Sequence, residues 1–395
     1  MINVDSTIHD GDIVTAASAA RLLGVKRATL YAYASRGLLT RVAIGRGRAS
    51  GYLRADVERL KARSAARAGH GAVASGALRW GEPVLDSAVT RIDPAQGPIY
   101  RGRAAVDLAQ SESPFEDVAS RLWQSASPAP WTPIRGRRVK ASASLSSLAL
   151  SVASLGFGET ARTDLSREDE ADLASRLIIA LAGARACGPS VAEALVASVG
   201  AARSGGRAVR AVNCALVLAA DHELNASTFA ARIAASAGAD LFACLTAAIA
   251  TLSGRRHGGE CDRVEALVRE VGTPRSARSV VLARTQHGDL LPGFGHPLYP
   301  DGDPRALPLL AAARALAPNA MRTLDAIVRE AREVLGLKPT LDVGLVAIAR
   351  AIGVPAAASA IFALGRCAGW TAHVIEQREA GFLLRPRARY LGETT

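Results

Sequence analysis

The stretch EADLASRLIIALAGARA, residues 170–186, places small and aliphatic residues at helical spacing, and this pattern decides the fold class. Residues 106–124 and 245–254 follow the same pattern, as does most of the chain after residue 104. Segments that alternate like β-strands are nearly absent there. Pro and Gly separate the helical segments, and no internal repeat links them. The sequence therefore predicts a large, mainly α-helical domain.

Length and composition set further limits. The chain has 395 residues, enough for about two or three domains. Apolar residues make up 49% and aromatic residues only 4%, so the core must consist mainly of Ala, Leu and Val, which favours close-packed helices. The five cysteines are widely spaced and form no C-x-x-C pair, which argues against disulfides and zinc. With neither a signal-peptide pattern nor a membrane-length apolar run, we expect a cytoplasmic location.

The N-terminal region has a different pattern. Residues 14–39, VTAASAARLLGVKRATLYAYASRGLL, predict a helix, a tight turn at Gly24 and a second helix. Residues 41–63 then predict a short, Gly-rich basic hairpin and a third helix that starts near Arg54. Residues 1–66 carry eleven Lys and Arg against five Asp and Glu, a surplus of six out of the net charge of +12. This region is therefore predicted to form a separate basic module.

Composition also suggests the boundaries between the parts. Residues 64–77, SAARAGHGAVASGA, contain few side chains that could anchor a structure and are typical of a linker. We therefore predict an N-terminal domain at 1–63, a linker at 64–79 and a helical domain at 80–395. Residues 82–103 contain Val and Ile runs separated by Asp, Pro and Gly, which predicts a small strand-and-turn region at the start of the helical domain.

Three of the seven histidines lie in short polar segments that interrupt the helical background: His222 in DHELNAST, His257 in RRHGGE and His296 in GFGHPLYPDGDPRA. Taken singly, each could equally be a buried structural histidine. However, Gly-flanked and charged turns allow close approach of a ligand to the backbone. Three histidines in such turns therefore indicate a functional site.

These segments, in this order, resemble the signature of the citrate synthase family: DHE-x-N-x-S, an HGG turn, GFGH followed by DPR, and a late Asp, here Asp342. Residues 364–378 and 385–392 look like the closing helix and tail of the family, so the resemblance covers roughly residues 80–392. It implies an all-helical fold with a large domain and a smaller mobile one, here about residues 229–343.

The resemblance also implies an activity: an acyltransferase that condenses acetyl-CoA with oxaloacetate to give citrate and CoA, without a metal or a bound cofactor. Asp342 would remove a proton from the acyl-CoA methyl group. His257 would stabilise the enol at the thioester oxygen, and His296 would polarise the ketone. Four residues would hold the oxaloacetate carboxylates: His222, Arg305, Arg366 and Arg385. Because the family's tail arginine reaches the neighbouring subunit, the resemblance further implies a homodimer with shared active sites.

The chain departs from the usual family pattern around the turn that contains His257. Arg255 and Arg256 stand where Pro-Leu is usual, and Cys261-Asp262 stand where Ala-Asn is usual. Two alternatives therefore remain open. One is 2-methylcitrate synthesis from propionyl-CoA, because one methylene group contributes only about 1 to 3 kcal/mol of discrimination. The other is a DNA-binding regulator whose synthase-like region senses these metabolites without turnover.

Within the N-terminal module, residues 24–39 resemble the MerR-type winged helix-turn-helix, which implies DNA as a partner. Side chains on the second helix and the hairpin would contact phosphates and base edges: Lys26, Arg27, Thr29, Tyr31, Tyr33, Arg46 and Arg48. The alternative is a packing or assembly module, in which the tyrosines are partly buried. We expect no membrane partner for either part of the chain.

Overall fold

The computed structural model describes residues 13–35, 38–43, 50–54, 56–58, 60, 85–126, 130–134, 144–156, 165–201, 205–255, 257–286 and 290–386. The chain divides into two compact units, Met1–Asp86 and Ser87–Thr395, and each is described here by itself. The predicted linker at 64–79 lies outside the described residues, and the domain boundaries remain predictions. None of the described helices is both long and apolar enough to cross a membrane.

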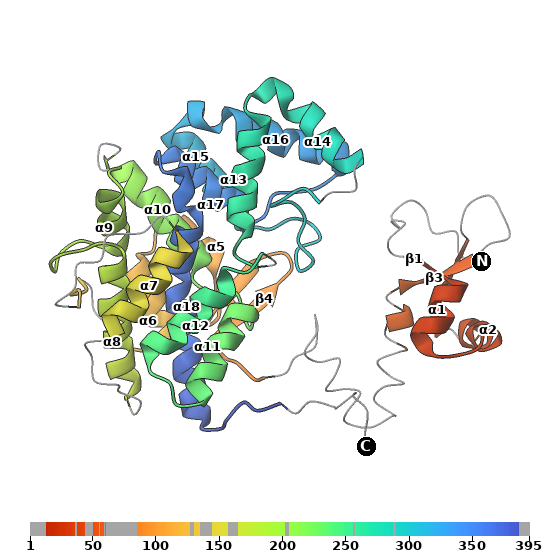
Figure 1. The fold of residues 1–395 in the computed structure, drawn as a ribbon, viewed down its shortest axis with the longest axis horizontal. Coiled ribbons are helices and arrows are strands. Elements are labelled where there is room, and N and C mark those ends of the chain that lie inside the picture. Colours follow the sequence, from red (N-terminus) through yellow and green to blue (C-terminus); the bar gives the residue numbers. More distant parts are fainter. Residues whose placement is uncertain are drawn as a thin grey trace, which may run out of the picture. The chain divides into compact units, whose positions relative to one another are not determined.

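The first unit combines two helices with a small antiparallel sheet of strand order β1-β3-β2 (Figure 1). Its elements are β1 (Ile13–Thr15), α1 (Ala16–Leu23), α2 (Arg27–Ser35), β2 (Arg41–Ala43) and β3 (Ser50–Leu53). The Thr15 side chain caps the start of α1, and Gly24 ends the helix in the left-handed conformation (φ 63°), as expected for the predicted turn. Arg54 begins a further helical segment, and Asp56 in that segment accepts a hydrogen bond from Thr40 N at 2.8 Å.

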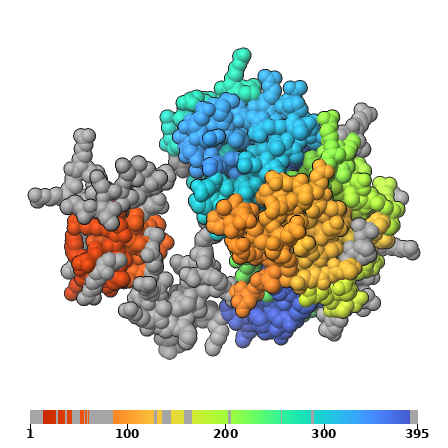
Figure 2. Space-filling view, turned by 180° about the vertical axis from the view of Figure 1, so that it is seen from behind, coloured from red at the N-terminus to blue at the C-terminus, as the bar shows by residue number. Residues whose placement is uncertain are grey.

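The second unit begins with three short antiparallel strands in the predicted strand-and-turn region: β4 (Thr90–Asp93), β5 (Gly97–Tyr100) and β6 (Arg103–Ala104). The turn between β4 and β5 ends at Gly97, whose φ of 82° and close contact with the Pro304 ring both disfavour a larger residue. Figure 2 shows this segment (orange) against residues near 300 (cyan). Tyr100 donates to the backbone carbonyl of Val217 at 3.1 Å, and its oxygen accepts from Asp221 N at 3.2 Å. The small sheet therefore contacts both the segment that precedes Arg305 and the end of helix α10 (Gly205–Ala219), next to His222.

The remainder of this unit is helical, as predicted, and most of its buried apolar residues form one core. Residues 106–124 form two helices rather than one, because a turn and Pro114 separate α5 from α6. The helical elements are α5 (Ala105–Gln110), α6 (Phe115–Trp123), α7 (Leu145–Gly156), α8 (Arg167–Leu181), α9 (Val191–Ser198), α10 (Gly205–Ala219), α11 (Ala226–Ser236), α12 (Leu241–Leu252), α13 (Glu260–Val271), η3 (Pro274–Ser276), α14 (Ala277–Gln286), α15 (Ala306–Leu316), α16 (Pro318–Leu335), α17 (Leu341–Ala351), η4 (Pro355–Ala357) and α18 (Ala358–Ala380).

Helix α18 runs through the centre of the helical unit and contacts α6, α8, α10, α11 and α12 (Figure 1). Two glycines allow it to approach the end of α10 at backbone distance. A Cβ atom at Gly365 would lie 2.7 Å from the Leu216 carbonyl oxygen, and one at Gly369 would lie 2.3 Å from Asp221 Oδ1. This close packing places Arg366, between the two glycines, beside the loop that carries His222.

Candidate active site

Six of the seven residues predicted to bind substrate or act in catalysis lie in one electrostatically coupled group. His222 follows α10, His257 precedes α13, and His296 lies in the segment before α15. The other three are on or next to helices: Arg305 directly before α15, Asp342 in the first turn of α17, and Arg366 in α18. The charges of Arg305 and Arg366 both act on His222 and Asp342, and that of Arg366 also acts on His257.

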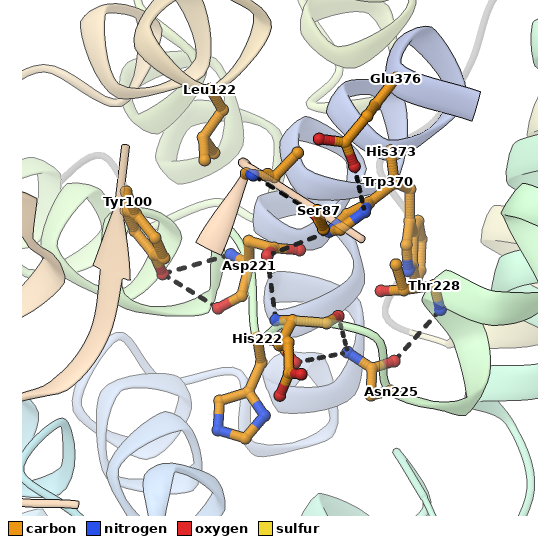
Figure 3. Close-up of polar contacts among 12 residues, drawn as sticks. Ser87, Tyr100, Leu122, Asp221, His222, Asn225, Thr228, Trp370, His373 and Glu376 are labelled. Atoms are coloured by element: carbon orange, nitrogen blue, oxygen red, sulfur yellow. Dashed lines mark hydrogen bonds and ion pairs between the residues drawn. The ribbon is translucent and has the colours of Figure 1, made fainter. Parts of the chain in front are cut away.

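The loop carrying His222 is fixed at both ends by hydrogen bonds (Figure 3). Asn225 caps α11 by accepting from Ser227 N and Thr228 N, and its amide donates to the His222 carbonyl. Glu223 takes the left-handed conformation (φ 55°), which is uncommon for a residue other than glycine. Figure 3 shows the His222 ring directed away from the polar group around Asp221. The hydrogen bonds therefore hold the backbone of His222 in place, and its imidazole ring projects from a fixed position.

Asp221, at the start of this loop, belongs to a buried polar cluster rather than to the group of six. Its Oδ2 lies 3.4 Å from His373 Nε2, and His373 Nδ1 lies 3.3 Å from the Arg232 guanidinium. Burial alone would raise the pKa of Asp221, but His373 and Arg366 lower it below its usual value. A charged Asp221 therefore ties α18 to the loop that carries His222.

An aromatic cluster forms around Tyr299, a residue that the sequence analysis did not single out. Its hydroxyl lies 2.7 Å from His222 Nε2, and the His296 ring centroid lies 4.9 Å from its own. The Arg305 guanidinium carbon lies 5.3 Å from the centre of the same ring. Tyr299 thus links three of the predicted residues. Its position three residues after His296 in one Gly-rich segment is the only sequence signal for this role.

His296 has a defined tautomer in this arrangement. Leu298 N donates to His296 Nδ1 at 3.1 Å, so Nδ1 acts as an acceptor and Nε2 carries the proton of the neutral ring. Burial, followed by the charge of Arg305, lowers the pKa of His296 below its usual value. At neutral pH the side chain is therefore an uncharged N–H donor.

Arg305 is buried and ion-paired within its own segment. Its Nε donates to Asp303 Oδ1 at 2.9 Å and its Nη2 to Asp303 Oδ2 at 2.8 Å. Asp303 also accepts from the backbone N–H of Leu341, at the start of α17. Burial alone would lower the pKa of Arg305, but Asp303 raises it. Asp303, two residues before Arg305, was not predicted, although the DPR spacing was visible in the sequence.

Arg366 is equally buried but has a different environment. Its Nε donates to the Ala219 carbonyl at 2.7 Å, and its guanidinium carbon lies 4.6 Å from the centre of the Phe362 ring. Among the described residues it forms no direct ion pair with a carboxylate. Burial lowers its pKa to about 10. A buried guanidinium of this kind is a strong candidate site for an anionic ligand.

His257 directly precedes the two glycines of the HGG turn. Gly258 is required there, because a Cβ atom would lie 2.5 Å from the Leu252 side chain. His257 Nε2 lies 2.8 Å from Ser227 Oγ, and the Trp370 indole donates to the same oxygen at 3.2 Å. Burial, with a further contribution from Arg366, lowers the pKa of His257 to about 4. The ring is therefore neutral at physiological pH.

Asp342 lies in the first turn of α17, where the helix dipole favours a negative charge. Its Oδ1 accepts from the Cys261 thiol at 3.2 Å, and its Oδ2 accepts from Thr340 Oγ1 at 3.3 Å. Desolvation nevertheless raises the pKa of Asp342 above its usual value. A partly exposed carboxylate with a raised pKa is suited to accept a proton.

The remaining predicted residues lie elsewhere. Arg385 is exposed near the end of the described chain, and no contact joins it to the other six within the part that the structure describes. In the N-terminal unit, Lys26 is exposed and Thr29 is partly buried. Tyr31 is 54% exposed, and Arg41 lies over its ring. Tyr33 is partly buried, and Arg27 opens α2. Arg46 and Arg48 lie outside the described residues.

Comparison with known proteins identifies the family of the second unit. The model of the citrate synthase C-terminal domain matches residues 77–387. The chain is 40% identical over 194 residues to the putative citrate synthase 2 of Mycobacterium tuberculosis, covering 47% of this chain and 52% of that protein. It is 35% identical over 190 residues to the 2-methylcitrate synthase of the same species, covering 47% and 48%. The chain thus spans about half the length of the curated relatives it matches.

Solved structures share this fold. The citrate synthase of Thermoplasma acidophilum, in its ternary complex with carboxymethyl coenzyme A and oxaloacetate, superimposes with a TM-score of 0.66. The match has 24% sequence identity and covers 79% of this chain and 95% of that chain. At this identity the likeness shows the fold alone. With a family model matched over residues 77–387, the chain belongs to the citrate synthase family.

Proposed function

We propose that this protein is a citrate synthase, which condenses acetyl-CoA with oxaloacetate and water to give citrate and free CoA. The observation that carries the proposal is the buried Arg366 guanidinium, which has no direct ion pair among the described residues and acts electrostatically on His222 and His257. A dicarboxylate substrate would supply a carboxylate bonded directly to this guanidinium, and Arg305 offers a second guanidinium nearby. The complex of the Thermoplasma acidophilum enzyme with oxaloacetate supports the same choice of substrate.

In the first step, Asp342 removes a proton from the methyl group of acetyl-CoA. Its raised pKa makes it a better proton acceptor than an ordinary carboxylate. His257 donates a hydrogen bond to the thioester oxygen, on which negative charge develops as the enol forms. The Ser227 hydroxyl donates to Asn225 Oδ1 at 2.7 Å, so in the free protein His257 Nε2 carries the proton of the neutral ring and donates to Ser227 Oγ. This N–H group would turn from Ser227 to the thioester oxygen when acetyl-CoA binds.

In the second step, the methyl carbon attacks the ketone carbon of oxaloacetate, and a new carbon–carbon bond forms. His296 donates a hydrogen bond from Nε2 to the ketone oxygen and stabilises the negative charge that develops there, and this oxygen takes up a proton to become the hydroxyl of the product. His222, held by Tyr299, together with Arg305 and Arg366 orients the oxo acid. Water then hydrolyses the thioester, which releases CoA as its thiol.

We further propose that residues from about 229 to 343 form a mobile part that closes over the substrates and excludes water from the enol. The helical domain would form a homodimer, in which Arg385 of each tail reaches the site of the neighbouring subunit. Arg385 is exposed, which leaves its guanidinium accessible to such a partner. A cytoplasmic location remains our expectation for this enzyme.

Acyl-chain preference is the main open choice within this proposal, since the chain is similar both to a putative citrate synthase and to a 2-methylcitrate synthase. The purified protein would be incubated with oxaloacetate and either acetyl-CoA or propionyl-CoA, and loss of the thioester followed in the ultraviolet. We expect turnover with acetyl-CoA and none in Asp342→Asn. Faster turnover of propionyl-CoA would instead make the protein a 2-methylcitrate synthase. Binding of oxaloacetate without thioester loss would favour a metabolite sensor.

For the N-terminal unit we propose DNA binding through a winged helix-turn-helix. The supporting observations are the short turn between α1 and α2, the three-stranded antiparallel sheet, and the exposed side chains of Lys26, Tyr31 and Arg41. Fluorescence anisotropy with labelled duplex DNA tests this. We expect affinity to fall steeply with salt and to weaken in Lys26→Ala. Equal affinity in the variant and the wild type would favour the packing module instead.

A further inference from the structure

Cys261 is the described cysteine whose thiol contacts the proposed general base. It is the second residue of α13, has no exposed surface, and donates to Asp342 Oδ1 with a sulfur–oxygen distance of 3.2 Å. Asp342 is the second residue of α17, so the contact joins the first turns of two packed helices. The first turns of two helices hold donor and acceptor, which limits the movement of both side chains.

The surrounding backbone holds the two helix starts at this distance. Gly293 packs between them, in the left-handed conformation (φ 79°). A Cβ atom at this position would lie 2.4 Å from Val264 of α13 and 2.6 Å from Val343 of α17. Gly293 N also donates to Glu260 Oε1 at 2.7 Å, and its carbonyl accepts from Thr340 N at 2.9 Å. One glycine therefore ties the residue before Cys261 to the segment before Asp342.

The chemistry of the pair makes the thiol a donor. Burial and the nearby carboxylate raise the pKa of Cys261 well above its usual value, so the sulfur keeps its proton at physiological pH. An S–H group is a weak donor, but a carboxylate acceptor strengthens the bond. Hydrogen bonds to a carboxylate favour its charged form, which opposes the desolvation of Asp342.

Other charges around Asp342 partly cancel. Glu260 and Asp303 disfavour its ionisation, whereas Arg305 and Arg366 favour it. Neither arginine is hydrogen-bonded to Asp342, and the described donors to its carboxylate are the Cys261 thiol and Thr340. The thiol distance of 3.2 Å is short for a sulfur donor, while the Thr340 distance of 3.3 Å is long for an oxygen donor. Cys261 is therefore the better-formed contact.

We infer that Cys261 is a positioning residue for the general base: its thiol holds Asp342 Oδ1, fixes the orientation of the carboxylate and favours the charged form that accepts a proton. The inference rests on the proposed function, in which Asp342 deprotonates acetyl-CoA. Cys261 itself touches no substrate in this account. It acts by occupying Oδ1, so that Oδ2, which has only the longer Thr340 contact, is left to accept the proton.

The test compares Cys261→Ala, which removes the donor, with Cys261→Ser, which keeps one. The matched control is Cys244→Ala. Cys244 lies in α12 and is equally buried, but its thiol donates to the carbonyl of Ala239, in the turn before the helix. Initial rates of thioester loss would be measured across the acidic pH range. In Cys261→Ala the pKa of Asp342 should rise, so the acidic limb of the kcat/KM profile should move to higher pH by roughly 0.5 to 1 unit. The shift is modest because a thiol is a weak donor. Cys261→Ser and Cys244→Ala should keep the wild-type limb.

A second readout does not need turnover. The S–H stretching band in the infrared spectrum reports hydrogen bonding by thiols, and the band missing from Cys261→Ala is that of Cys261. We expect this band to move to higher frequency in Asp342→Asn, because the charged acceptor is lost. If the pH profile of Cys261→Ala matched that of the wild type, or if the S–H band did not move in Asp342→Asn, the inference would be overturned. The proposed function would still stand, provided that the wild type turns over. An inactive wild type would remove the proposed function, and the S–H band would still decide whether the contact exists.

Discussion

Two arginines of the candidate site, Arg305 and Arg366, are buried to the same degree, with 3% and 1% of their surface exposed, but have opposite electrostatic surroundings. Arg305 has its counter-charge within the segment, where Asp303 binds it through two hydrogen bonds and raises its pKa despite burial. The direct contacts of Arg366 are a backbone carbonyl and an aromatic ring instead, and the charge of Asp221 offsets only part of its burial, so its pKa is lowered to about 10. Arg305 therefore has a directly bonded carboxylate before substrate arrives, whereas Arg366 does not.

This comparison indicates how the site divides stability from binding. A buried ion pair strongly resists loss of one partner, because the other charge is left uncompensated. A buried cation without a directly bonded carboxylate instead costs stability in the free protein and regains it when an anion binds. We therefore expect Arg305 to contribute mainly to the fold of the site and Arg366 mainly to recognition of the substrate.

The largest effect on stability should come from Arg305→Leu. Removing the guanidinium leaves Asp303 buried without its partner, which should cost about 3 to 5 kcal/mol of unfolding free energy. Urea denaturation measures this. The double variant Arg305→Leu/Asp303→Leu should recover much of the loss, because neither charge is then left alone. A single variant as stable as the wild type would show that the pair does not support the fold.

Arg366→Leu should show the reverse pattern. We expect unfolding free energy to stay the same or rise, whereas affinity for oxaloacetate should fall at least ~30-fold, the equivalent of about 2 kcal/mol or more. Calorimetric titration measures the affinity. Arg350→Leu is the matched control, since Arg350 pairs with Glu265 near the other end of α17 from Asp342. Unchanged oxaloacetate affinity in Arg366→Leu would remove the central role of this residue.

Acid sensitivity offers a third comparison. The pKa of His257 is lowered to about 4, by burial and then by Arg366. Between its usual value and about 4 the unfolded chain binds a proton that the folded chain does not, so stability falls as the pH falls through this window. We expect wild-type protein to lose on the order of 2 kcal/mol relative to His257→Asn between about pH 7 and pH 4. In Arg366→Leu this loss should be smaller, and an equal loss would contradict the assigned coupling.

The smallest effect should come from the tyrosine that contacts Arg305 and His222. Tyr299→Phe keeps the ring against Arg305 and His296 but removes the hydroxyl that contacts His222. One hydrogen bond of about 0.5 to 1.5 kcal/mol corresponds to a roughly 2- to 12-fold loss in kcat/KM for oxaloacetate. Steady-state kinetics at varied oxaloacetate concentration measures this. A loss as large as that of Tyr299→Ala would assign the effect to the hydroxyl alone.

Much of the fold could be predicted from the sequence because its cause is local. Helical spacing of Ala and Leu predicts the mainly helical unit, and Gly24 predicts the turn after α1. A periodic pattern does not show where a helix is interrupted, so the break between α5 and α6 was missed.

The candidate site was predictable only in part. Polar segments within an apolar background pointed to the histidines, the resemblance to the citrate synthase family pointed to Asp342, and the structure brings them together. The contact between Cys261 and Asp342 joins residues 81 positions apart, and nothing in either local sequence predicts it. The Tyr299–His222 contact spans 77 positions and was equally hidden. Such pairs depend on how α10, α13 and α17 pack, which is a property of the whole core.

The central claim is that Asp342 deprotonates an acetyl group which then joins oxaloacetate. The most direct test supplies the wild-type chain with oxaloacetate and acetyl-CoA deuterated at the methyl group, and examines the products by mass spectrometry, with Asp342→Asn as the control. The account predicts free CoA and citrate that has lost one of the three methyl deuterons, with neither product formed by the variant. Oxaloacetate that binds while the thioester stays intact, or turnover that persists in Asp342→Asn, would contradict it.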